Sequence, residues 1–190
     1  TKNNLRNKHS ISVDAFVIIS IGTCCERKQH THILEAVKRL KSKIPNLLYL
    51  HLGSGVDEEE EKRICSMNDT DSNVIFVGNV ENVNDFLVMS DLYLMTSKIE
   101  GLGNATVEAM GAAIPCVLYD TPGSRDLGVG PAPGILIDPN TNALEKSILD
   151  FYNLNSNKKI DLGIESLKFV NDNYSKNSAI FNWRVVYLNH

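Results

Sequence analysis

Two glutamates, Glu100 and Glu108, lie eight positions apart in the segment SKIEGLGNATVEAM. Carboxylates accept hydrogen bonds from sugar hydroxyls. Gly101 and Gly103 lie between them and let the backbone approach a ligand closely. The helix predicted to begin near Gly103 offers free amides and a positive dipole end to an anion such as a diphosphate. By itself, this pattern favours an ordinary glycine turn with two solvated glutamates over a binding site.

A second group of candidates follows the first apolar segment, in the stretch GTCCERKQ. Gly22 permits a turn, Lys28 can place an ammonium over a phosphate, and Arg27 can offer a guanidinium fork. The glycines at 53 and 55 form a further turn of the kind that contacts ligands. They do not form a dinucleotide fingerprint, because Glu58 stands where the third glycine would be.

The histidines, cysteines and acidic run do not match a known metal motif. The cysteines match neither a zinc nor a redox spacing, and we expect four reduced thiols: Cys24, Cys25, Cys65 and Cys116. We predict surface or helix-edge positions for the histidines His30, His32 and His51. The run DEEEEKR is interpreted as a solvated helix face. On these residues, the sequence predicts neither a metal nor a cofactor.

Apolar segments alternate along the chain with segments of helical periodicity. The strands are predicted at 15–21, 47–52, 73–77, 91–95, 116–119 and 135–137. The helices are predicted at 32–43, 57–67, 83–89, 104–112, 142–151, 158–173 and 178–188. This alternation predicts a doubly wound α/β fold with a parallel sheet of about six strands and C-terminal helices. Such folds bind ligands beyond the carboxyl ends of their strands.

The same pattern divides the chain into three parts. Residues 1–14 are polar and lack periodicity, so we predict a linker. Residues 15–155 form the Rossmann-like unit, and 156–190 form C-terminal helices. The composition, with 43% hydrophobic and 22% charged residues and a net charge of -4, is that of a globular domain and argues against a nucleic-acid partner. No apolar run approaches the roughly 20 residues of a membrane helix, and the start of the chain carries no signal-peptide core.

The order of these motifs resembles the C-terminal, donor-binding half of the GT-B retaining glycosyltransferases of family four, also called glycosyl transferases group one. The resemblance covers about 16–188. It rests on the ordered segments SIGTCCERKQ, HLGSGVDEEEEKRI, EGLGNATVE, PCVLYDTPGSRD and YSKNSAIFNWRVVYL. It implies transfer of a sugar from a nucleoside diphosphate to a hydroxyl acceptor with retention of configuration, in the synthesis of cell-surface polysaccharide or glycoconjugates.

The resemblance also implies roles for individual residues. Glu100 would hold sugar hydroxyls, Glu108 the ribose and Lys28 a phosphate, and we take Glu100 and Lys28 as the catalytic pair. The remaining donor contacts would be made by Gly22, Thr23, Gly53, Gly78, Asn79, Val80, Gly101, Leu102, Gly103 and Asn104. Three positions depart from the family pattern: Thr23 stands for an arginine, Gln29 for a glycine and Asp126 for a glutamate.

The partners implied are a nucleotide-sugar donor and an N-terminal acceptor-binding domain, which this chain lacks. We therefore expect the fragment by itself to be inactive. The C-terminal helices at 156–190, the last of them at 178–188, would pack toward that missing domain. The full enzyme is expected in the cytoplasm or at the inner face of the cytoplasmic membrane. Two alternatives remain open: a fragment of a GT-B nucleotide-sugar epimerase, and a non-catalytic nucleotide-binding or regulatory α/β module.

Overall fold

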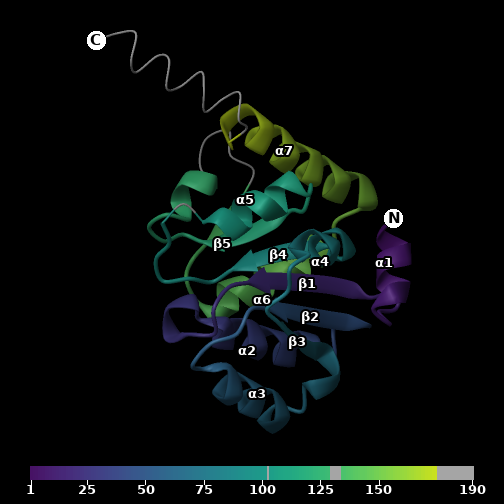
Figure 1. Ribbon diagram of the computed structural model, residues 1–190, viewed down its shortest axis with the longest axis vertical. Coiled ribbons are helices and arrows are strands. Elements are labelled where there is room, and N and C mark those ends of the chain that lie inside the picture. Colours follow the sequence, from purple (N-terminus) through teal and green to yellow (C-terminus); the bar gives the residue numbers. More distant parts are fainter. Residues whose placement is uncertain (102, 129–133, 175–190) are drawn as a thin grey trace.

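A six-stranded parallel sheet forms the centre of the computed structural model, which describes residues 1–101, 103–128 and 134–174 (Figure 1). The strand order is β3-β2-β1-β4-β5-β6, as in a doubly wound dinucleotide-binding fold. The predicted fold class and all six predicted strands are confirmed. Their bounds are β1 (Phe16–Ile21), β2 (Leu47–Leu52), β3 (Val74–Gly78), β4 (Leu92–Met95), β5 (Cys116–Tyr119) and β6 (Ile135–Ile137).

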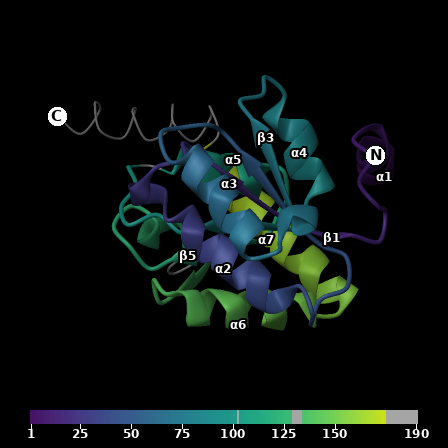
Figure 2. The same ribbon diagram turned by 90° about the horizontal axis from the view of Figure 1, so that it is seen from below.

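Helices cover both faces of the sheet (Figures 1 and 2). One face packs against α2 (His30–Leu40), α3 (Glu58–Met67) and α6 (Thr141–Tyr152). The other packs against α1 (Lys2–Lys8), α4 (Val83–Met89), α5 (Asn104–Gly111) and α7 (Ser156–Tyr174). Short 3-10 turns lie at Glu26–Lys28, Asp71–Asn73 and Arg125–Leu127.

The apolar run of β1 is explained by the helices that pack on both faces of the sheet. Ile18 belongs to the core under α2, whereas Val17 and Ile19 belong to the core under α4 and α5. All three side chains are fully buried. A strand buried on both faces is apolar throughout rather than alternating, and this explains why β1 is recognisable from its sequence.

The predicted linker at 1–14 is wrong for its first part, because Lys2–Lys8 forms the helix α1. Polar contacts hold this helix against the domain. Arg6 is 3% exposed, and its guanidinium donates to the Met89 carbonyl at 2.9 Å and pairs with Asp91 at 2.8 Å. Lys2 reaches the same carboxylate at 2.6 Å. An anchor made by charged residues leaves no apolar period in the sequence.

The predicted helix at 158–173 is confirmed as α7, which lies along α5 (Figure 1). Gly163 makes the contact close, since a Cβ there would collide with the carbonyl oxygen of Ala113. Within the described residues the C-terminal unit therefore covers the Rossmann-like domain itself. The helix predicted at 178–188 lies outside the described residues. Among the described helices, none has the length and apolarity to cross a bilayer.

Candidate functional site

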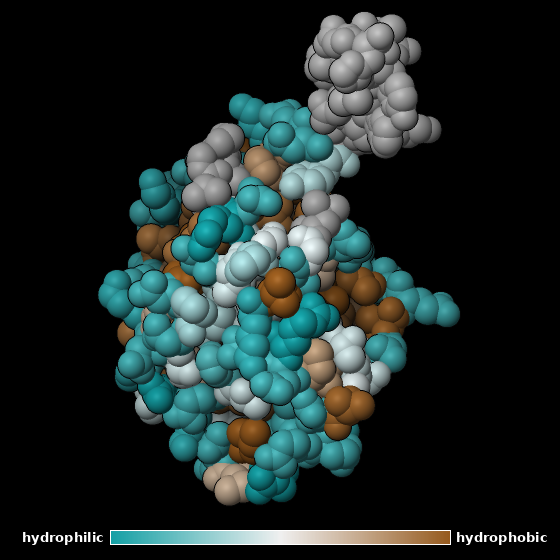
Figure 3. All heavy atoms as spheres, turned by 90° about the vertical axis from the view of Figure 1, so that its left-hand side faces the viewer, coloured by the Kyte–Doolittle hydropathy of each residue, from teal (hydrophilic) through white to brown (hydrophobic). Residues whose placement is uncertain are grey.

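The candidate site lies between β1 and β4, where the order of strands in the sheet reverses. β1 and β4 are neighbours, but β1 leads to α2 on one face and β4 leads to α5 on the other. The loops that follow these two strands diverge and leave a crevice at their carboxyl ends. Lys28 lies in the first loop and Glu100 in the second. Figure 3 faces this edge and shows a mostly hydrophilic surface with separate hydrophobic spots.

Lys28 and Glu100 form an ion pair although 72 positions separate them in the sequence. The Lys28 ammonium lies 2.7 Å from Oε1 of Glu100, and Arg27 approaches Oε2 at 3.8 Å. The two paired side chains are only 15% and 10% exposed. The structure therefore brings together the two residues predicted as the catalytic pair, and it adds Arg27 at the margin.

Hydrogen bonds to main-chain carbonyls hold the Lys28 loop and the Glu100 loop together. The Thr96 hydroxyl donates to the Lys28 carbonyl at 2.8 Å, and the Lys98 amide donates to the Arg27 carbonyl at 2.9 Å. These bonds fix the end of β4 against the loop after β1, so the ion pair forms between backbones that are already positioned.

A third loop, after β5, supports the backbone of Glu100. The Glu100 amide donates to the Pro122 carbonyl at 2.9 Å. Gly123, at φ +84°, lies so close that a Cβ would collide with the Glu100 carbonyl oxygen. Glycine is required there both for the left-handed conformation and for the close approach.

The electrostatic surroundings keep Glu100 ionised. Burial by itself raises the pKa of this carboxyl, but the hydrogen bond from Lys28 and the positive charges of Lys28 and Arg27 outweigh it. The net pKa of Glu100 therefore lies below its ordinary value. An ionised carboxylate accepts hydrogen bonds from hydroxyl groups and does not donate one.

Six of the predicted donor residues line one hollow of about 230 Å³ at the ends of β1, β2 and β3: Gly22, Thr23, Gly53, Gly78, Asn79 and Val80. Gly22 donates its amide to the Leu52 carbonyl and Gly53 donates to that of Gly78, both at 2.9 Å. These bonds draw three strand ends together around the hollow.

Glu108 is exposed on α5 and lines a different hollow, of about 380 Å³, together with residues of α4. Val83 lines both this hollow and the one formed by the strand ends. The two recesses are therefore neighbours. Glu108 therefore lines a hollow beside the strand-end hollow, and Glu100 lines neither of these two.

The amino end of α5 adjoins the Glu100 loop. Gly103 is the N-cap at φ +66°, and its carbonyl accepts hydrogen bonds from the amides of Thr106 and Val107. Asn104, the first helical residue, is exposed, as is Gly101. The amides of Asn104 and Ala105 precede these bonds and have no acceptor within the helix, which leaves them available to an anion. Leu102 lies outside the described residues.

Gln29 adopts the left-handed conformation, with φ 51° and ψ 38°. This geometry gives a physical reason for the glycine expected here from the family pattern, because side chains disfavour positive φ. Gln29 connects the Lys28 turn to α2, so the strained residue lies directly beside the phosphate-binding candidate.

The predicted surface positions of two histidines are wrong. His30 is 4% exposed and His51 is fully buried. His32 is half-buried and shares a 2.8 Å hydrogen bond with the Tyr119 hydroxyl. The acidic run is a solvated face except for Glu61, which is 2% exposed. The four cysteines are free thiols, as predicted.

Known proteins resemble this chain in sequence and in fold. Residues 1–168 match the family model described as "Glycosyl transferases group 1". The putative glycosyltransferase EpsD of Bacillus subtilis is 28% identical over 123 residues, which cover 65% of this chain and 32% of EpsD. The lipopolysaccharide core biosynthesis glycosyltransferase LpsE of Rhizobium meliloti is 28% identical over 133 residues, 70% of this chain and 38% of LpsE.

Among solved structures, HepE from Anabaena in complex with UDP superimposes with a TM-score of 0.86 at 18% identity, over 98% of this chain and 51% of HepE. At that identity the likeness concerns the fold. The chain spans about a third to a half of the length of the curated relatives it matches. The family match, the strand order and the GT-B neighbours agree: the chain belongs to the glycosyl transferases group 1 family and folds as one Rossmann-like half of a GT-B enzyme.

Proposed function

We propose that this chain is the donor-binding half of a retaining glycosyltransferase that transfers a sugar from a nucleoside diphosphate to a hydroxyl acceptor. The observation that carries the proposal is the partly buried ion pair of Lys28 and Glu100 at the switch point of the sheet. It places a cation and an ionised carboxylate side by side. A nucleotide-sugar has matching groups side by side, because its diphosphate adjoins a ring of hydroxyls.

The donor would lie along the carboxyl edge of the sheet. The hollow lined by Gly78, Asn79 and Val80 would take the base. Lys28 and the first amides of α5 would meet the diphosphate, Glu100 would hold sugar hydroxyls, and Glu108 would hold the ribose. Lys28 has three donor hydrogens, so it can bond a phosphate oxygen while it still bonds Glu100.

Transfer would pass through an oxocarbenium-like transition state, as in glycoside hydrolysis. Negative charge would then grow on the leaving diphosphate. Lys28 and the amino end of α5 would stabilise that charge. Glu100 would orient the ring rather than remove a proton. We propose that no metal takes part in transfer, because these groups meet the leaving charge. The Asp-x-Asp pair of the sequence, Asp69 and Asp71, lies before the amino end of β3, at the opposite edge of the sheet from the donor site.

Thr23 stands where the family pattern has arginine, so a charge-assisted contact to phosphate is replaced by at most a neutral hydrogen bond. We expect donor binding to be correspondingly weak in this chain.

We also propose that sugar transfer needs the acceptor-binding half. The related proteins in polysaccharide and lipopolysaccharide synthesis indicate the kind of product that we propose.

Calorimetric titration of the chain with UDP, GDP, ADP and their sugars tests the proposal. UDP is the first nucleotide to titrate, because HepE was crystallised in complex with UDP. Lys28→Met should weaken binding by about 10- to 100-fold, which corresponds to the loss of one charged hydrogen bond of about 1.5–3 kcal/mol. Lys146→Met, on an exposed face of α6, is the matched control.

If no nucleotide binds, or if Lys28→Met binds as tightly as the Lys146→Met control, the donor-site assignment fails. If none of the nucleotides binds, the interpretation of the chain as a regulatory module is favoured. Measurable sugar transfer by this chain alone would contradict the requirement for a second half.

A further inference from the structure

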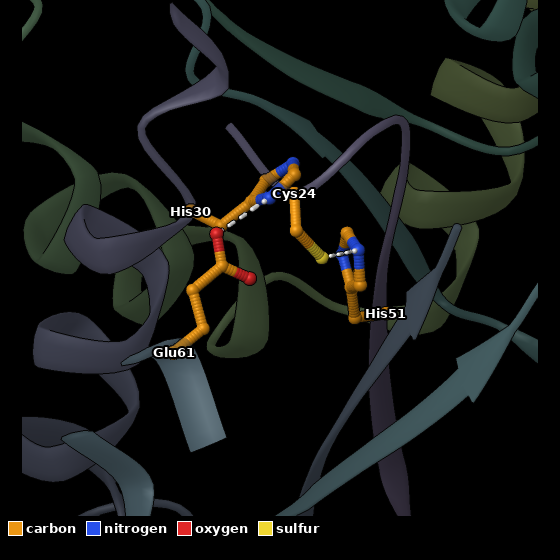
Figure 4. Close-up of side chains that lie close together, drawn as sticks. All are labelled: Cys24, His30, His51 and Glu61. Atoms are coloured by element: carbon orange, nitrogen blue, oxygen red, sulfur yellow. Dashed lines mark hydrogen bonds and ion pairs between the residues drawn. The ribbon is translucent and has the colours of Figure 1, made fainter. Parts of the chain in front are cut away.

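Four buried side chains from four separate segments converge beside the donor edge (Figure 4). Cys24 comes from the loop after β1, His30 from the start of α2, His51 from β2 and Glu61 from α3. All four point toward a common centre in Figure 4. Each is at most 4% exposed, and one candidate ligand atom from each lies within 4.8 Å of all the others.

The distances suit a single small ion. Sγ of Cys24 lies 3.1 Å from Nε2 of His51, and Nδ1 of His30 lies 3.2 Å from Oε1 of Glu61. Tetrahedral zinc with bonds of about 2.0–2.3 Å keeps its ligand atoms about 3.3–3.8 Å apart. Pairs at the 4.8 Å limit would have to close by about 1 Å, a small side-chain movement.

Contacts within the protein leave one of these polar groups unsatisfied. Oε2 of Glu61 is buried and has no hydrogen-bond partner among the described residues. A buried carboxylate oxygen without a partner carries a large desolvation cost. A cation at the centre of the cluster would remove that cost.

A second layer of contacts orients one of the candidate ligands. Ser20 Oγ lies 3.1 Å from Nδ1 of His51 and 2.6 Å from the Tyr49 hydroxyl. This contact turns Nε2 of His51 toward Cys24. Metal-binding histidines characteristically engage their second ring nitrogen in this way.

We propose that Cys24, His30, His51 and Glu61 bind one zinc ion in a closed, structural site. A thiolate, a carboxylate and two neutral imidazoles balance the two positive charges of zinc, and this ligand set suits zinc better than magnesium or calcium. His30 and Glu61 also line a surface hollow of about 360 Å³, which gives an ion access from solvent.

The ion would brace the loop that carries the donor residues. The Cys24 amide donates to the Ser54 carbonyl at 3.3 Å, and the Cys24 carbonyl accepts from the Asp57 amide at 3.1 Å. Cys24 thus already joins the loops after β1 and β2, and Thr23 precedes it directly. Zinc would add α2 and α3 to the same junction without touching Lys28 or Glu100.

Metal analysis of the purified chain, prepared without a histidine tag from zinc-supplemented cells, tests the proposal. We expect about one zinc per chain. Cys24→Ser should reduce the zinc content to background, whereas Cys65→Ser, a buried thiol of α3 outside the cluster, should retain it. Ser20→Ala should weaken zinc binding by about 10- to 100-fold, because it releases the His51 ring.

Cobalt titration supplies a readout that does not depend on yield or on donor binding. Tetrahedral cobalt bound by a thiolate should give ligand-field bands and a charge-transfer band that vanish in Cys24→Ser and persist in Cys65→Ser. If Cys24→Ser does not fold, Glu61→Gln takes its place and should lower cobalt affinity. Wild-type chain that holds no more zinc than background, or a cobalt spectrum that Cys24→Ser leaves unchanged, overturns the proposal and leaves a hydrogen-bonded polar core.

Discussion

The Arg6 guanidinium holds the first helix through hydrogen bonds to four acceptors, and its removal should be strongly destabilising. Besides Met89 and Asp91, it donates to the carbonyl oxygens of Val13 at 2.8 Å and Ala15 at 3.0 Å. Arg6→Met keeps the apolar stem but leaves these acceptors without their donor. Breaking a buried ion pair from one side costs about 3–5 kcal/mol. The side chain of Asp91 is 25% exposed, so we expect a loss of stability at the lower end of this range, about 3 kcal/mol.

Lys2→Met is the matched control, because Lys2 pairs with the same carboxylate from a side chain that is 38% exposed. An exposed pair contributes about 0–1 kcal/mol. The free energy of unfolding is measured by urea titration with circular dichroism, and the midpoints are compared at constant slope. If Arg6→Met costs no more than Lys2→Met, then α1 is not an integral part of the domain, and the correction to the predicted linker is itself wrong.

Two further predictions concern the loop that carries Glu100. Gly123→Ala should destabilise the domain by about 2–4 kcal/mol, because it combines a strained positive φ with a collision at the Glu100 carbonyl. Gly101→Ala, where a Cβ would meet no described residue within 4 Å, should change stability by less than about 0.5 kcal/mol in the same urea titration. Equal effects of the two substitutions would contradict the close packing of the loops. The pH dependence of stability should also depend on Glu100. Its pKa is lower in the folded protein than the ordinary value of 4.5, so its ionised form stabilises the fold above that pH, and the stabilisation is lost as the pH falls through the lowered pKa. Melting temperatures recorded from neutral pH down to about pH 3 should therefore fall more steeply for the wild type than for Glu100→Gln, and parallel curves would refute this.

Much of the fold can be predicted from the sequence because its strands are buried on both faces. β1 is apolar at nearly every position, so its apolar run alone identifies it as a central strand. The position of Lys28 opposite Glu100 also follows from topology, since the carboxyl ends of parallel strands share one edge. α1 escapes prediction because buried charge rather than apolar periodicity docks it.

The buried cluster also escapes prediction, although the sequence contains two signals for it. His51 is a polar residue within the apolar strand LLYLHL, and such a side chain is either at an edge or paired inside. Glu61 precedes Cys65 by one helical turn, so both lie on one face of α3, and that face is buried. Neither signal identifies the partner, because Cys24 and His30 come from a loop and a helix start whose positions depend on the whole fold.

The mutual anchoring of the loops at the donor edge has a consequence for binding energetics. Three chain segments lose their freedom during folding, through the bonds from Gly22 to Leu52, from Gly53 to Gly78 and from Lys98 to Arg27. A ligand that arrives at this edge therefore has little loop entropy left to remove, and rigid surfaces bind with a smaller ordering cost. Differences in affinity between nucleotides should then reflect the contacts themselves, and they should be seen in dissociation rates rather than association rates.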